Sequence, residues 1–123
     1  MEKSANGWPT SADPEDIDIV RKAVPGTDLK LKCAKAVAPL LIAFAADFHK
    51  QVEPIDKGTL DDWGYAYRKV RGSNSVVSNH SSGTAIDLNA TKHPLGAVDT
   101  FTTEQAATIR RLCRKYEIGR AHV

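Results

Sequence analysis

One short stretch of the chain carries a histidine and an aspartate at a spacing that suits metal binding. His80 offers an imidazole, the side chain most often used as a metal ligand, and Asp87 offers a carboxylate. Gly83 lies between them and allows the backbone to turn sharply. In a strand after that turn, side-chain alternation places Asp87 toward His80, with the small Ala85 on the same face. The two residues supply two of the three protein ligands of a catalytic zinc site. A His–Asp hydrogen bond that only fixes the turn fits the spacing as well.

The pattern around this pair is more specific than the spacing. Residues 78–87 read Ser-x-His-x-x-Gly-x-Ala-x-Asp, with Trp63–Arg68 upstream and His93–Gly96 downstream. Together these segments resemble the D-alanyl-D-alanine carboxypeptidase family of zinc metallopeptidases, which includes phage endolysins that cut the L-alanyl-D-glutamate bond. The resemblance runs from about Asn6 to Tyr116. It implies a hedgehog-like α+β fold with a small antiparallel sheet and flanking helices, zinc as the cofactor, and peptidoglycan stem peptides as the substrate. Which peptide bond is cut stays open.

The resemblance also implies roles for individual residues. His80 and Asp87 match the first two zinc ligands of the family. An arginine shortly before the motif binds a carboxylate of the peptide substrate, and Arg68 fits this position best, with Arg71 as the alternative. A planar guanidinium can hold a carboxylate through two parallel hydrogen bonds. Ser78 either forms a hydrogen bond near the substrate or ends its strand.

The chain departs from the family pattern at its C-terminal end. The family has a third histidine ligand on a late strand, three residues after an acidic general base. Here His122 follows Gly119 at that spacing, and no acid stands there. The segment Glu117–Val123 resembles the translation of a sequencing adapter. We therefore expect a single peptidase-like domain over residues 1–116 with an irregular N-terminal arm, a non-native tail over 117–123, a missing last strand, and weak or no activity.

Two helices are predicted from apolar periodicity. The first has Val37, Leu41, Phe44 and Phe48 on one face and should run from near residue 36 to before residue 54, a proline. The second should begin after Thr102, because Gln105 three residues later completes a capping box. Its buried face is expected to comprise Ile109, Leu112, Cys113 and Tyr116. These faces belong to the core.

Several short strands are also expected. Alternating aromatic residues predict a strand over residues 63–68, and short apolar runs predict strands over 76–78 and 84–88, with a turn between the last two. Residues 16–20 fit either a strand or one turn of helix.

Composition narrows the possible classes of protein. A chain of 123 residues with 41% hydrophobic and 26% charged residues is long enough for one globular domain. A net charge of +2 without a run of basic residues argues against nucleic-acid binding. No apolar stretch is long enough to span a membrane or to act as a signal peptide. We therefore expect a monomer made in the cytoplasm without a signal peptide, which reaches the cell wall after release or lysis.

Two other functions compete with a zinc peptidase. One is a non-catalytic cell-wall-binding or phage structural module on the same fold. The other is a cysteine hydrolase that uses Cys113, although this residue falls on a buried helix face. Cys33 and Cys113 are expected to be buried free thiols. His93 is expected to be structural or at the surface, whereas three further polar residues are expected to be exposed and without partners: His49, Asp61 and Asp62.

Overall fold

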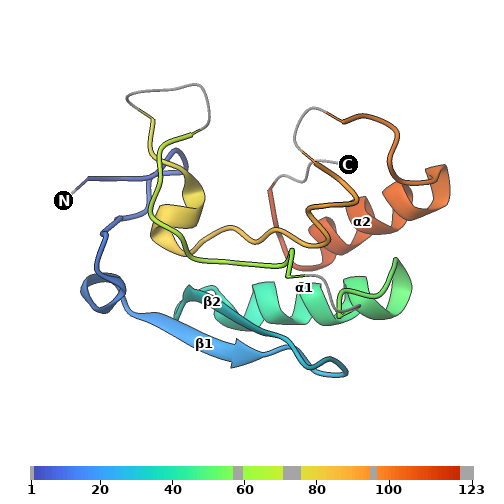
Figure 1. The fold of residues 1–123 in the computed structure, drawn as a ribbon, viewed down its shortest axis with the longest axis horizontal. Coiled ribbons are helices and arrows are strands. Elements are labelled where there is room, and N and C mark those ends of the chain that lie inside the picture. Colours follow the sequence, from blue (N-terminus) through green and yellow to red (C-terminus); the bar gives the residue numbers. More distant parts are fainter. Residues whose placement is uncertain (1, 57–59, 71–75, 95–96, 120–123) are drawn as a thin grey trace.

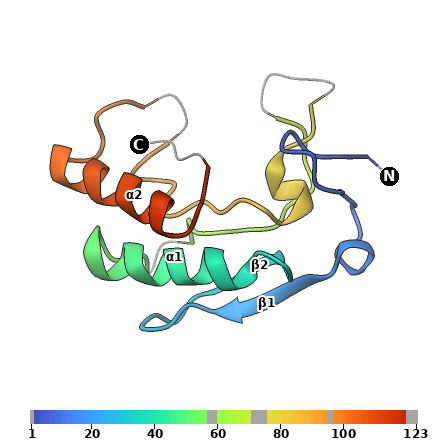
Figure 2. The ribbon, with the colours of Figure 1, turned by 180° about the vertical axis from the view of Figure 1, so that it is seen from behind.

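The computed structural model describes residues 2–56, 60–70, 76–94 and 97–119, and these form an α+β fold (Figure 1). Its regular elements are two strands, two α-helices and two short 3₁₀ helices: η1 (Pro14–Ile17), β1 (Ile19–Ala23), β2 (Lys30–Ala34), α1 (Ala38–Gln51), η2 (Asn79–Ser82) and α2 (Thr103–Lys115). Helix α1 lies between the β1–β2 hairpin and α2 (Figures 1 and 2). None of the helices in the described ranges is long and apolar enough to cross a membrane.

Residues 16–20, which were expected to form either a strand or one turn of helix, contain parts of both. Residues 14–17 form η1, which ends at Asp18 with a left-handed backbone at φ 50°. Strand β1 follows at once and pairs antiparallel with β2, from Ile19 opposite Ala34 to Ala23 opposite Lys30. Leu31 and Cys33 point from β2 into the core.

Helix α1 confirms the boundaries expected from its prolines. Pro39 stands in the first turn, where its missing N–H costs no helical hydrogen bond, and the helix ends at Gln51 before Pro54. The buried residues of α1 are Ala38, Leu41, Phe44, Ala45 and Phe48.

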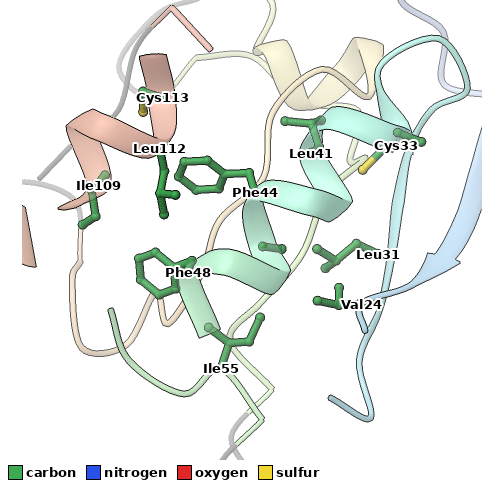
Figure 3. Packing of buried hydrophobic residues seen from close by; sticks show 12 residues of the cluster. Val24, Leu31, Cys33, Leu41, Phe44, Phe48, Ile55, Ile109, Leu112 and Cys113 are labelled. Atoms are coloured by element: carbon green, nitrogen blue, oxygen red, sulfur yellow. The ribbon is translucent and has the colours of Figure 1, made fainter. Parts of the chain in front are cut away.

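Helix α2 begins as its capping box predicts. The Thr102 hydroxyl accepts a hydrogen bond from the Gln105 N–H, and the Gln105 side chain accepts one from the Thr102 N–H. Ile109, Leu112 and Cys113 are buried. Figure 3 shows the core they form with α1 and the hairpin, with Cys33 and Cys113 at separate places in it. Both cysteines are free and buried, as expected.

The strands expected over residues 63–68, 76–78 and 84–88 are wrong. In the described ranges these segments are extended but form only isolated bridges, Trp63 with Asp87 and Val77 with both Ser4 and Lys69. The reason is that backbone groups on the same side of the 63–68 segment bond to different parts of the chain. The Trp63 N–H donates to the Asp87 carbonyl, whereas the Tyr65 N–H, two residues further on, donates to the Lys32 carbonyl, so no continuous ladder forms.

Gly83 ends η2 where no other residue fits, and this yields a test of the fold. Its φ is +72°, and a Cβ there would lie 2.4 Å from Ile19 Cδ1 and 2.6 Å from the Ala34 nitrogen. Gly26 has φ +83° with nothing within 4 Å, and Gly119 has neither constraint. We expect Gly26→Ala to lower the free energy of unfolding by about 1–2 kcal/mol, Gly83→Ala to lower it further, and Gly119→Ala to leave it nearly unchanged. Urea unfolding measures all three, and equal losses at positions 83 and 26 would contradict the close packing of η2 on the hairpin.

Candidate metal centre

The 3₁₀ helix η2 holds His80 in a network of serine hydroxyls. The Ser78 Oγ accepts a hydrogen bond from the His80 N–H and caps the helix. Ser81 is fully buried, and its Oγ both accepts from the Arg68 N–H at 2.8 Å and donates to the Arg68 carbonyl at 2.9 Å. The Ser82 Oγ lies 2.9 Å from Ser4 Oγ in the N-terminal arm. His80 therefore stands on a turn that is anchored on two sides.

The imidazole of His80 is oriented through one ring nitrogen. Its Nδ1 lies 2.6 Å from the Gly64 carbonyl oxygen, and because a carbonyl can only accept, Nδ1 carries the proton. In the neutral ring, Nε2 is then free to act as a metal ligand or hydrogen-bond acceptor. This Nε2 lies 3.4 Å from Oδ2 of Asp87, and the His80 side chain is only 8% exposed.

Trp63 positions Asp87 through both its backbone and its side chain. The backbone of Trp63 and Asp87 exchanges two hydrogen bonds, and the indole Nε1–H donates to Asp87 Oδ2 at 2.8 Å. Burial by itself would raise the pKa of Asp87. The hydrogen bond and charge of His80, the indole of Trp63 and the charge of Arg68 outweigh burial, so the pKa of Asp87 lies below its ordinary value. Asp87 is held as a carboxylate.

The arrangement of His80 and Asp87 suits two ligands of one metal ion. Two atoms bound to a tetrahedral zinc ion at about 2.0–2.2 Å lie roughly 3–4 Å apart, and Nε2 and Oδ2 are separated by 3.4 Å. The same distance fits a direct ion pair when the imidazole is protonated. Within the described residues, no group of three or more His, Cys, Asp or Glu side chains could hold a metal ion. His122 lies outside those residues.

A cleft of about 1020 Å³ is lined by Asp87 but not by His80, which is buried behind it. Its lining includes the polar residues Arg68, Ser78 and Asp87 and core residues such as Leu41 and Phe44. The Arg68 guanidinium has no hydrogen bond or ion pair with any described residue, although its charge acts on Asp87. Arg68 is therefore available to a ligand in the cleft. Arg71, the alternative, lies outside the described residues.

The expectation that Asp61 and Asp62 are exposed and without partners is wrong. Asp61 is 4% exposed, and its Oδ2 accepts hydrogen bonds from the N–H and the hydroxyl of Thr91. Asp62 is half-buried, and its Oδ1 accepts from the Asn89 N–H at 2.7 Å, whereas its Oδ2 is buried with no partner among the described atoms. Both aspartates hold the segment that follows Asp87.

The two remaining histidines have structural contacts. His93 Nε2 lies 2.7 Å from Glu53 Oε2, and its ring stacks on Phe101 with centroids 3.6 Å apart. This agrees with the structural role expected for His93. His49, expected to be exposed, is instead half-buried, and its Nδ1 accepts a hydrogen bond from the Ile55 N–H at 3.1 Å.

Sequence reasoning missed Trp63 and Gly64 as supports of the site. Gly64 is pressed against β2, where an added Cβ would lie 2.1 Å from the Lys32 carbonyl oxygen. A glycine inside an otherwise strand-like aromatic segment is the signal for such a close backbone approach.

Comparisons of the chain with protein-family models, with curated proteins and with solved structures found no match. The resemblance to the D-alanyl-D-alanine carboxypeptidase family therefore rests on the sequence motif.

The indole of Trp63 should control the ionisation of Asp87. In Trp63→Phe the donor to Oδ2 is lost, and because that donor favours the charged form, the pKa of Asp87 should rise. The carboxyl carbon chemical shift of Asp87, followed by NMR through an acid titration, measures this. Trp8→Phe removes an indole that has no side-chain hydrogen bond among the described residues and is the matched control. An equal pKa in both variants would contradict the positioning role of Trp63.

Asp62 should make the stability of the protein depend on pH. Burial, aided by the charges of Asp61 and Asp56, raises its pKa to about 6 although the Asn89 N–H opposes the rise. The folded chain therefore binds more protons than the unfolded chain between about pH 4 and 6, and the free energy of unfolding falls as the pH rises through this window.

The substitution Asp62→Asn keeps the acceptor for Asn89 and removes the titration. The free energy of unfolding of this variant minus that of the wild type should increase by on the order of 1 kcal/mol from pH 4 to pH 7. Asp28→Asn, at an exposed loop position, is the control. Urea unfolding at several pH values decides the matter, and a constant difference between wild type and Asp62→Asn would refute the prediction.

Proposed function

We propose that this chain is a zinc-dependent peptidase that cleaves the stem peptides of peptidoglycan, on the hedgehog-like fold of the D-alanyl-D-alanine carboxypeptidase family. The main support is the pairing of His80 Nε2 with Asp87 Oδ2 at 3.4 Å, with Asp87 on the lining of a large cleft. The motif over residues 78–87 adds to it, as does the Arg68 guanidinium on the same cleft, which has no partner among the described residues.

Each of the site residues has a defined task in this proposal. His80 presents Nε2 because Gly64 holds the proton at Nδ1, and Asp87 stays charged because Trp63 and Arg68 favour its ionised form. When bound, zinc supplies Lewis acidity toward the scissile carbonyl and lowers the pKa of a water to about 7. Arg68 holds a carboxylate of the substrate in the cleft. Ser78 acts on His80 by capping its turn.

A cell-wall-binding module without catalysis is the second candidate. The observation that favours it is the lack, among the described residues, of a third metal-ligating side chain near His80 and Asp87. A cysteine hydrolase receives less support, because burial raises the pKa of the Cys113 thiol above its ordinary value. An activated nucleophile needs the opposite shift.

Zinc binding is the first test of the proposal. The wild-type chain should bind zinc with a single site in isothermal titration calorimetry, and His80→Ala or Asp87→Asn should weaken this binding at least about tenfold. His49→Ala, which removes a histidine outside the cleft, is the control for non-specific binding. Equal affinity in all four proteins would show that the pair is a structural ion pair only.

Hydrolysis is the second test. We expect the 123-residue chain to release soluble peptides from purified cell walls slowly, because no side chain among the described residues is placed as a general base, a contribution typically worth about 10²–10⁴-fold in rate. This release should stop with a chelator and in His80→Ala, and Arg68→Ala should lose most of it. Wall binding without any release would favour the non-catalytic module, whereas release that a chelator leaves intact would exclude a zinc peptidase.

A further inference from the structure

Positive charge is concentrated in the β1–β2 hairpin. Residues 19–35 contain five basic residues and one acid, a charge of 5 − 1 = +4, so the rest of the chain carries 2 − 4 = −2. The basic residues are Arg21, Lys22, Lys30, Lys32 and Lys35. The small net charge of the whole chain therefore results from a strongly basic segment and a weakly acidic remainder.

The register of the hairpin places three of these cations on one face. Arg21 lies directly opposite Lys32, and Lys30 lies opposite Ala23 on the same side of the sheet. Like charges directly opposite each other on a sheet destabilise it. No described acidic side chain forms an ion pair with any of the three cations. The hairpin therefore keeps an unfavourable charge pair that an anionic ligand would neutralise.

This face is part of a cavity. A hollow of about 430 Å³ is lined by Arg21, Lys30 and Lys32 on one side and by residues 62–65 on the other. The one acid in its lining, Asp62, has its Oδ1 bonded to the Asn89 N–H and forms no ion pair with the hairpin. The cavity thus presents three cations that are available to a ligand.

Trp63 connects this cavity to the candidate metal centre. Trp63 lines both the small cavity and the larger cleft, and its indole donates to Asp87. Trp63 is 45% exposed, so a ligand can reach it from solvent. Aromatic rings beside polar groups are common surfaces for such contacts.

We infer that Arg21, Lys30 and Lys32 form an anion subsite that extends the substrate-binding cleft across Trp63 and binds anionic groups of the cell-wall polymer. This inference rests on the proposed function for the identity of the polymer. Carboxylates of stem peptides and phosphodiesters of wall-linked polymers share the required chemistry, since both accept charge-assisted hydrogen bonds from Arg and Lys.

The test compares two double variants of equal charge. Arg21→Gln with Lys32→Gln removes two cations from the cavity, and Lys22→Gln with Lys35→Gln removes two cations of the same 19–35 segment that do not line it. In sedimentation with purified cell walls, the first variant should bind about tenfold more weakly than the wild type, and the second should bind nearly as well. Loss of a like-charge pair should leave the first variant at least as stable in urea, so misfolding does not explain weaker binding.

Treatment of the walls identifies the anion. Hydrofluoric acid removes phosphodiester-linked polymers, and carbodiimide amidation neutralises carboxylates. Binding lost after the first treatment assigns the subsite to phosphodiesters, and binding lost after the second assigns it to carboxylates. Unchanged binding after both, equal binding by the two double variants, or no wall binding by the wild type would overturn the inference.

Zinc titration separates this inference from the proposed function. The variant at Arg21 and Lys32 should bind zinc as tightly as the wild type, whereas His80→Ala should lose zinc and keep its binding to walls. A wild type that binds no zinc but shows the expected difference between the double variants would refute the peptidase proposal and support the subsite.

Discussion

The close approach of the Gly64 backbone to the Lys32 carbonyl sets the geometry of the whole site. A Cβ at position 64 would lie 2.1 Å from that oxygen, and the Tyr65 N–H donates to it at 2.7 Å. This contact fixes an extended segment against the edge of β2. The carbonyl of Gly64 then faces His80 Nδ1, and the indole of the preceding Trp63 reaches Asp87. One backbone contact therefore aligns both candidate metal ligands with the hairpin.

Local signals in the sequence were enough to predict the helices. Pro39 and Pro54 bound α1, and the capping box at Thr102 places the start of α2 at its observed residue. These features act within a few residues of each other, so their effect is visible in the sequence. The approach of His80 to Asp87 was also expected, because one glycine turn and one extended segment separate them.

The supports of the site could not be predicted in the same way. Trp63 bonds to a residue 24 positions away and Gly64 to one 16 positions away. Alternating aromatic residues suggested a strand, but the backbone groups around them bond in turn to β2, η2 and the Asp87 segment. Likewise Asp61 looks solvent-exposed in the sequence and is buried because Thr91 packs onto it. Only the folded chain shows which loop lies against which.

The two aspartates beside Trp63 show how the surroundings set the pKa of a carboxyl group. Both are half-buried, and burial raises the pKa of a carboxyl group in each case. At Asp87 the hydrogen bond and charge of a protonated His80, the indole of Trp63 and the charge of Arg68 outweigh burial, so the pKa lies below the ordinary value. Asp62 has one backbone donor and the negative charge of Asp61 beside it, so its pKa rises to about 6. A carboxyl group has to be ionised to bind a metal, and the Trp63 indole and the Arg68 charge favour that form of Asp87. Asp62 serves instead as an anchor, which keeps Asn89 in place two residues beyond Asp87.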